Sequence, residues 1–452
     1  MSIISRDKDK PSPAEADQPN ASSPPPSTES ELDVETLVAE VKRAFAPLER
    51  ELVGFGPLLT QAVYALLTGE NLLVFSPPGT AKTLFARLLF QRIDGASVFD
   101  TQMSKGSLAE ELFGSVDIEQ MKAGRVLHNT RATLVDADLA FIDEFFDAND
   151  MVLRALLGIF HERVFKKGTQ TEPARLHTGI AAANYVRATN ITQAVVDRFL
   201  FRATIAPDYH PYTLLAIDQA FGRHYGEREA VAGGRVPLTH LTRLASLVRG
   251  ELPQREITAP PHVLFMKNAL INRYRELLTQ RSARTDGGAS APYISPRTYA
   301  KSRLVLNAAA MMRGRAEVSC EDLSQLRYVV TTIGGPELEA KCFEDALKWT
   351  LTTIRDTDRE HVDRLIAAQE LAEQLLQRVE TGEHLPRTHF LQRLLKMFGL
   401  ISVGDLTFHH VRRFVDDIFP RDEHVKQLKQ KLIGRLQELT RRIDFDDDHL
   451  FG

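Results

Sequence analysis

The chain has 452 residues, of which 43% are hydrophobic, and carries a formal net charge of −4 at pH 7. This length and composition allow two or three domains with sizeable cores, and the near-balanced charge excludes the broad basic field that attracts nucleic acid. Cys320 and Cys342 are too few for a disulfide framework or a cysteine zinc site, and no apolar run reaches the length of a membrane span. Because the amino terminus also lacks the apolar core of a signal peptide, we expect a cytoplasmic protein.

Residues 1–34 are rich in Ser, Pro, Ala, Asp and Glu, with three consecutive prolines at positions 24–26. Such a segment cannot bury enough apolar surface to fold, so we expect a disordered leader, although it could carry a docking motif. In residues 35–212, short apolar runs alternate with helical patterns. This alternation predicts an α/β domain whose parallel sheet is flanked by helices.

The most informative segment of this domain begins with the apolar run Asn71–Phe75, which predicts a buried strand. A Pro/Gly turn follows, and a helical pattern starts at Ala81. Such a loop directs several backbone N–H groups and the positive end of a helix dipole towards one point, which suits a polyphosphate. The candidate phosphate-binding loop comprises Ser76, Pro77, Pro78, Gly79, Thr80, Ala81, Lys82 and Thr83.

Within this loop, Lys82 would contact the β- and γ-phosphates, and the hydroxyl of Thr83 would hold Mg²⁺. Ser76 and Ala81 replace both glycines of the pattern G-x-x-x-x-G-K-[ST]. A Pro-rich turn with a solvated lysine is therefore the alternative interpretation of the segment.

Two later apolar runs also end in polar side chains. Asp143 and Glu144 follow the run Leu139–Ile142, which would place both carboxylates at the ligand-binding edge of a parallel sheet. Asp143 could hold Mg²⁺, and Glu144 could polarise the water that attacks a γ-phosphate, unless the pair is an ordinary solvated turn. Asn184 ends the run that starts at His177 and stands where a γ-phosphate sensor would be, although Asn is also a common turn residue.

Arg198 follows in the segment Asp197–Phe199. It could reach the nucleotide of a neighbouring subunit as an arginine finger, or it could form a surface salt bridge within its own chain.

The remainder of the chain is expected to be mainly helical. Residues 213–335 have helical patterns interrupted by polar loops, and Arg297 stands at the start of the predicted helix Thr298–Met312. In residues 336–452, apolar residues spaced by three and four trace one helix face from Val362 to Val379 and another from Val425 to Ile443. These faces predict a helical carboxyl-terminal domain, which could also bind a partner or support assembly.

Together these motifs resemble the MoxR family of AAA+ ATPases, and the RavA-like branch most closely. The resemblance covers roughly residues 40–335. It rests on Val53-Gly54, on the loop at residues 77–83, and on the segments at residues 111–118, 141–145, 156–163, 182–184, 197–200 and 292–297.

The resemblance implies an AAA+ P-loop ATPase core with an α-helical lid formed by residues 213–335, and ATP and Mg²⁺ as cofactors. It implies that Val53 and Gly54 lie beside the nucleotide and that Arg297 is the sensor 2 arginine of the lid. It also implies a homohexameric ring that matures or activates a client protein complex, with a von Willebrand factor A domain protein as partner.

From these residues we expect Mg²⁺-dependent ATP hydrolysis, with Glu144, Asn184, Arg198 and Arg297 as catalytic groups. One alternative is a nucleic-acid-associated motor or loader, which the acidic balance and the lack of a DNA-binding module disfavour. A second alternative is a nucleotide-gated scaffold with weak hydrolysis, because Ser76 departs from the usual glycine.

Overall fold

A computed structural model describes residues 33–185, 194–226, 234–252, 256–285, 294–330, 336–381, 395–396 and 406–449. Residues 1–32 of the predicted leader lie outside this described part, and the first helix begins at Val34.

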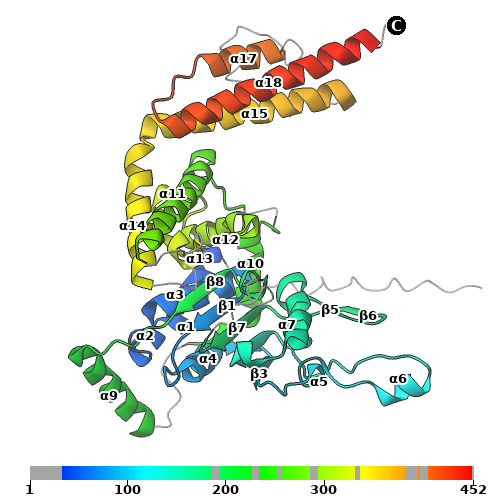
Figure 1. The fold of residues 1–452 in the computed structure, drawn as a ribbon, viewed down its shortest axis with the longest axis vertical. Helices are drawn as coiled ribbons and strands as arrows, with labels where there is room; N and C mark the ends of the chain where they lie inside the picture. Colours follow the sequence, from blue (N-terminus) through cyan, green and yellow to red (C-terminus); the bar gives the residue numbers. More distant parts are fainter. Residues whose placement is uncertain are drawn as a thin grey trace, which may run out of the picture.

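A five-stranded sheet forms the centre of the molecule (Figure 1). All of its neighbouring strands are parallel, in the order β3-β4-β7-β1-β8. The strands are β1 (Leu72–Phe75), β3 (Val98–Gln102), β4 (Leu139–Asp143), β7 (Thr178–Ala183) and β8 (Phe201–Thr204). The predicted α/β core with a parallel sheet is therefore confirmed.

Successive residues of the central strands belong to two different cores. Leu72 and Val74 of β1 pack into the first core, whereas Leu73 and Phe75 pack into the second. Since strand side chains alternate between the two faces of a sheet, helices must cover both faces. This explains why β1, β4 and β7 appear in the sequence as continuous apolar runs.

The two cores are closed by different sets of helices. On the first face these are α1 (Val34–Phe45), α2 (Leu48–Glu51), α3 (Gly56–Thr68) and α4 (Lys82–Phe90). On the second face they are α5 (Ala109–Phe113), the 3-10 helix η1 (Phe145–Asp147), α7 (Asp150–Leu157) and the single-turn π-helix η2 (Gly158–Glu162).

Several small elements complete this domain. A parallel pair joins β2 (Ile93–Asp94) to β9 (Val236–Pro237), and an antiparallel hairpin joins β5 (Val164–Lys167) to β6 (Gln170–Pro173). The short helix α6 (Ile118–Lys122) and this hairpin both project from the body of the domain (Figure 1).

After β8, the described chain is mainly helical. Helix α9 (Pro211–Gly226) projects by itself from the body of the molecule (Figure 1). The following elements pack into the first core against the sheet, which holds them firmly to the α/β domain. They are α10 (Leu238–Arg249), α11 (Pro261–Thr285), α12 (Pro296–Met312), η3 (Cys320–Leu326), α13 (Arg327–Val330) and α14 (Pro336–Thr353).

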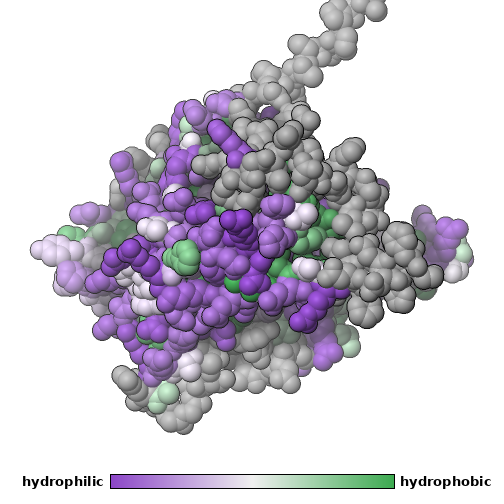
Figure 2. Space-filling view, turned by 90° about the horizontal axis from the view of Figure 1, so that it is seen from above, coloured by the Kyte–Doolittle hydropathy of each residue, from purple (hydrophilic) through white to green (hydrophobic). Residues whose placement is uncertain are grey.

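A third core lies among α15 (Asp356–Thr381), α17 (Phe408–Asp416) and α18 (Glu423–His449), at the far end of α14 (Figure 1). It includes Val362, Leu365, Val425 and Leu432, which lie on the two apolar faces seen in the sequence. The predicted helical carboxyl-terminal part is thus confirmed. Seen from this end, the described surface is mainly hydrophilic (Figure 2). Within the described ranges, no helix is both long and apolar enough to span a membrane.

Candidate functional site

The candidate phosphate-binding loop connects β1 to α4 at the carboxyl edge of the sheet. Gly79 and Ala81 both have positive φ, at 80° and 57°, which turns the chain sharply into the helix. Helix α4 begins at Lys82, and no side chain caps its first turn. The N–H groups of that turn are therefore available to an anion, which the helix dipole also favours.

Ser76 does not occupy a conformation that requires glycine. It is not among the residues with positive φ, and its N–H donates to the carbonyl of Ala183 at 3.1 Å. Its buried hydroxyl accepts a hydrogen bond from Thr80 Oγ1 at 2.6 Å. Serine thus closes the loop through its side chain, and its backbone lies in an ordinary region for an L-residue.

Lys82, Asn184 and Glu144 are joined in one hydrogen-bonded chain. Lys82 Nζ donates to Asn184 Oδ1, and Asn184 Nδ2 donates to Glu144 Oε1. Beside this chain, Thr83 Oγ1 donates to Asp143 Oδ2 at 3.3 Å, and the N–H of Glu144 donates to Asp143 Oδ1 at 2.9 Å. Three separate strand ends thereby bring all five of these predicted residues together, because the carboxyl ends of β1, β4 and β7 share one edge of the sheet.

The oxygen atoms of Thr83 and Asp143 are hard ligands of the kind that Mg²⁺ prefers. In the described ranges, no cluster of three or more His, Cys, Asp or Glu side chains is arranged to hold a metal ion. A magnesium ion at this place would therefore need further ligands from a nucleotide or from water. Burial, and then the charge of Asp143, raise the pKa of the Asp100 carboxyl on neighbouring β3. The sequence patterns did not single out Asp100, because β3 lies at the edge of the sheet and is not a buried apolar run.

A cavity of about 610 Å³ extends from the loop and is lined mainly by apolar residues. Val53 and Gly54, which the resemblance placed beside a nucleotide, line it together with Gly79, Thr80 and Ala81. This volume falls in the usual range for small-molecule sites, and apolar walls suit a nucleoside base. The sequence reasoning missed the opposite wall, which consists of residues 205–209 and of Thr213, Leu214, Ile217, Ala220 and Phe221 on α9.

Arg198 and Arg297, the two arginines predicted to act at the site, lie near each other. In the described part of the chain, neither forms a hydrogen bond with the phosphate-binding loop. Arg198 donates from Nη1 to the carbonyl of Ala194 at 2.6 Å, and its buried Nε has no hydrogen-bond partner among the residues that the structure describes. Arg297 donates from Nη1 to Asp197 Oδ2 at 2.7 Å. Burial lowers the pKa of His161, and the positive charges of Arg297, Lys301 and Arg198 lower it further. The structure thus places Arg297 beside the segment that contains Arg198 and pairs it with Asp197.

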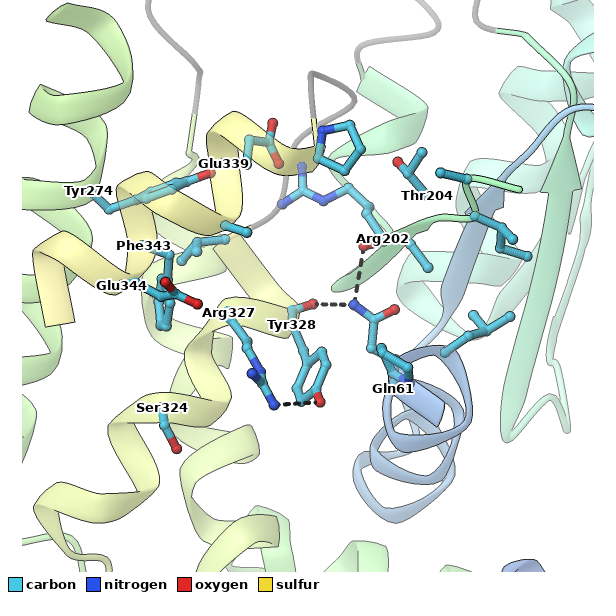
Figure 3. A pocket seen from close by; sticks show the side chains of 18 of the residues that line it. Gln61, Arg202, Thr204, Tyr274, Ser324, Arg327, Tyr328, Glu339, Phe343 and Glu344 are labelled. Atoms are coloured by element: carbon cyan, nitrogen blue, oxygen red, sulfur yellow. Dashed lines mark hydrogen bonds between the residues drawn. The ribbon is translucent and has the colours of Figure 1, made fainter. Parts of the chain in front are cut away.

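A second cavity, of about 430 Å³, lies between β8 and the helices that follow it (Figure 3). Gly54, Phe55, Ile205 and Ala206 line both cavities and form a shared wall. Gln61 Nε2 donates to the carbonyls of Arg202 and Tyr328, at 3.3 Å each, and so joins β8 to α13 (Figure 3). Arg202 Nε and the hydroxyl of Tyr274 are buried and have no hydrogen-bond partner in the described ranges. Because these two atoms are themselves covered, a ligand in the cavity would not reach them unless side chains moved.

The sequence matches one family model over residues 39–227, that of the MoxR domain in the MoxR-vWA-beta-propeller ternary systems. An uncharacterised protein of Methanocaldococcus jannaschii is 26% identical over 284 residues, which is 59% of this chain and 64% of that protein. A second uncharacterised protein of the same organism is 33% identical over 145 residues, 32% of this chain and 39% of that protein. Chaperone MoxR1 of Mycobacterium tuberculosis is 29% identical over 178 residues, 38% of this chain and 46% of MoxR1. The chain therefore spans less than two thirds of the length of each of these relatives.

The fold is also similar to a crystal structure of a candidate ATPase from Cytophaga hutchinsonii. The TM-score is 0.54 with 19% sequence identity, and the match covers 70% of this chain and 95% of the other. At this identity the likeness concerns the fold alone.

Proposed function

Because residues 39–227 belong to the MoxR family of AAA+ ATPases, we propose that the chain is a Mg²⁺-dependent ATP hydrolase. The observation that carries the proposal is the bonded chain of Lys82, Asn184 and Glu144 beside the uncapped start of α4. A cation for phosphate, a neutral amide and a carboxylate for water are the groups that phosphoryl transfer to water requires.

Each residue of the cluster has a distinct task. Lys82 exchanges Asn184 for phosphate oxygens, while the backbone N–H groups of the loop hold the phosphates. Thr83 and Asp143 would hold Mg²⁺, which, when bound, neutralises charge on the phosphates and draws electrons from the bond that breaks. Glu144 accepts a hydrogen bond from the attacking water, and Asn184 keeps Glu144 in position.

We assign the remaining cations to a second copy of the chain. Arg198 and Arg297 share the segment around Asp197, so one neighbour that docks by this surface would bring both arginines to the same nucleotide. Arg297 would then leave Asp197 for a phosphate oxygen, which offers more negative charge. A site that needs a neighbour's residues favours a closed ring, and the family resemblance suggests a homohexamer.

Steady-state phosphate release from Glu144→Gln protein tests the proposal. We expect turnover to fall at least 100-fold while binding of a fluorescent ATP analogue stays within about threefold, since the amide keeps the shape but does not polarise water. Glu119→Gln is the matched control, because Glu119 is an exposed acid of α6 and should leave both quantities unchanged. Unchanged turnover in Glu144→Gln protein would refute the assignment.

The work that hydrolysis drives is, in our proposal, remodelling of a protein complex together with a von Willebrand factor A domain protein. The description of the matching family model, which names vWA and beta-propeller components, supports this partner, and the chaperone description of MoxR1 supports the activity. We also propose that the chain belongs to the RavA-like branch of the family and acts in the cytoplasm.

A pull-down with Glu144→Gln protein in ATP should retain a vWA protein, whereas Lys82→Ala protein, which cannot hold the phosphates, should not. Tight binding of labelled DNA at physiological salt would instead favour a nucleic-acid motor, which the net charge of −4 disfavours. The weak-hydrolysis scaffold predicts turnover that Ser76→Gly raises at least tenfold. We expect a change of less than threefold, because Ser76 has no positive φ.

A further inference from the structure

Cys320, His262 and Asp363 form a cluster that the proposed function does not use. His262 lies in the first turn of α11, Cys320 begins η3, and Asp363 lies in α15. His262 Nδ1 lies 2.8 Å from Asp363 Oδ2, and the backbone N–H of His262 donates to Asp363 Oδ1 at 2.8 Å. A histidine that is paired with an acid and stands beside a cysteine is an arrangement that activates a sulfur nucleophile.

The thiol of Cys320 lies against the same face of α11 as His262. Cys320 Sγ and Met266 Sδ are 3.7 Å apart, and Met266 follows His262 by about one helical turn. Cys320 is also close enough to the imidazole to contribute, after Asp363, to the raised pKa of His262. His262 therefore has both an acid and a thiol as neighbours.

The imidazole of His262 is positively charged at neutral pH, because its neighbours raise its pKa to about 9. A cation beside a cysteine favours the thiolate, which is the form that attacks disulfides. The cluster is open to solvent, since the side chains of His262 and Asp363 are 22% and 39% exposed and Cys320 is partly exposed. A small reagent can therefore approach the sulfur from outside.

Cys342, the other cysteine of the chain, has different surroundings. It is buried in the first core, and burial raises the pKa of its thiol. Its sulfur lies 3.6 Å from Arg281 Nη1, so a cation is present there as well. A small molecule would reach this sulfur only if the first core opened. The two cysteines thus provide a comparison between an open and a closed site within one protein.

We propose that Cys320 is a modification site, at which its thiolate exchanges with a small disulfide and forms a mixed disulfide beside His262. Sγ forms a bond to one sulfur of the reagent, and the bond between the two sulfurs of the reagent breaks. The other half leaves as a thiolate and takes a proton from water. Cys320 is oxidised and the leaving half is reduced, so the exchange needs no further oxidant, and an excess of small thiol reverses it.

The mixed disulfide changes the contact between α11 and α15. The modified sulfur is neutral, and the attached group occupies space beside His262. This group displaces the imidazole from Asp363 and frees the N–H of His262, which has no intrahelical acceptor in the first turn of α11. The balance between small disulfides and small thiols then sets how firmly α15 is held to α11.

The rate of modification tests the role of His262. Bis(2-hydroxyethyl) disulfide is a suitable probe, because it is uncharged and its approach does not depend on surface charge. Mass mapping of peptides after timed exposure and an acid quench measures the adducts at Cys320 and Cys342 separately. We expect Cys320 to react about 50-fold faster than Cys342 or more, and His262→Gln to slow Cys320 by about tenfold or more, since the amide has no charge.

His240→Gln is the matched control for this experiment. His240 Nδ1 lies 2.7 Å from Glu40 Oε2, and its side chain is 22% exposed, as is that of His262. Because His240 lies in α10 outside the cluster, its substitution should leave the rate at Cys320 within about twofold of wild type. Equal rates at Cys320 and Cys342 would overturn the modification site, and a rate unchanged by His262→Gln would overturn the role of the histidine.

Asp363→Asn gives a second test of the same cluster. It keeps His262 but removes the carboxylate that holds its proton, so Cys320 should again react more slowly, by about threefold or more. An unchanged rate would contradict the proposal. For each variant, binding of a fluorescent ATP analogue within about threefold of wild type reports correct folding.

Amide hydrogen exchange tests the structural consequence. In the mixed disulfide, we expect exchange in the first turn of α11, at residues 261–265, to be about tenfold faster or more, and to return to the original rate after dithiothreitol. Cys320→Ser protein exposed to the same disulfide is the control and should show no change. Unchanged exchange in the mixed disulfide would overturn the link to α15. None of these readouts depends on ATP turnover, so the proposed function is judged separately by Glu144→Gln protein.

Discussion

The amide of Asn184 offers the sharpest test of how the polar cluster works. It links Lys82 to Glu144, and Asn184→Ala removes both hydrogen bonds at once. A hydrogen bond to a charged group contributes about 1.5–3 kcal/mol. The bond to Glu144 should persist through the chemical step, so its loss should lower kcat roughly 10- to 150-fold.

The hydrogen bond between Lys82 and Asn184, by contrast, should break when ATP binds. Lys82 must release Asn184 before it can hold phosphate, so removing the amide should not raise KM by more than about twofold. Asn184→Asp gives a different result, since two unit charges about 4 Å apart at an effective dielectric constant of ~20 interact by about 4 kcal/mol. The new carboxylate would repel Glu144 and hold Lys82, so both a lower kcat and a higher KM are expected.

A phosphate-release assay over a range of ATP concentrations measures both constants. Asn129→Ala is the control, because Asn129 is an exposed loop residue whose Oδ1 accepts a hydrogen bond from the N–H of Arg131, outside the cluster. A kcat for Asn184→Ala within threefold of wild type would refute the bridging role, as would a KM for Asn184→Asp no higher than that of Asn184→Ala.

Two further predictions concern stability. Ala81 has a φ of 57°, a conformation that costs an L-residue about 1–2 kcal/mol. Glycine avoids this cost but loses more backbone entropy on folding, so Ala81→Gly should raise the free energy of unfolding, measured in urea, by up to about 1 kcal/mol. Ala81→Val should lower it. The hydrogen bond to Asp363, with that to Cys320, raises the pKa of His262 to about 9. A raised histidine pKa stabilises the fold fully below the unfolded value of about 6.5, and this contribution disappears as pH rises through about 9. His262→Gln should thus lower the free energy of unfolding by about 1 kcal/mol at pH 5.5 and have little effect at pH 10. An equal loss at both pH values would contradict the ion pair.

The sequence was sufficient where local pattern and chemistry coincide. The apolar runs before Ser76, Asp143 and Asn184 are short, continuous and followed by polar residues, so their strands were correctly predicted. Parallel strands place their carboxyl ends at one edge, and this alone brings Lys82, Glu144 and Asn184 into contact. The conformation of Ser76 was beyond such reasoning, because a φ angle depends on the whole turn and not on the residue type.

Contacts between distant segments could not be predicted in the same way. Arg297 and Asp197 are separated by 100 positions, and their ion pair depends on how α12 docks against the sheet. Periodicity predicted mainly helical structure from residue 213 onward but contained no information about the neighbours of each helix. The place of α9 at the cavity, and the link that Gln61 makes between Arg202 and Tyr328, are products of packing in three dimensions.

Helix α14 is a long connection between the first core and the third core. It has 18 residues, so it is about 27 Å long, and it leads from the helices of the first core to the third core formed by α15, α17 and α18 (Figure 1). At its far end, the N–H and Nδ1 of His262 on α11 both bond to Asp363 on α15, at 2.8 Å each, which forms a brace between the two domains. A braced arm of this length converts each degree of rotation at its base into about half an ångström of travel at its tip. Any tilt of α14 would thus displace α15 and α18, and loss of the contacts between His262 and Asp363 would let α15 tilt separately from α11.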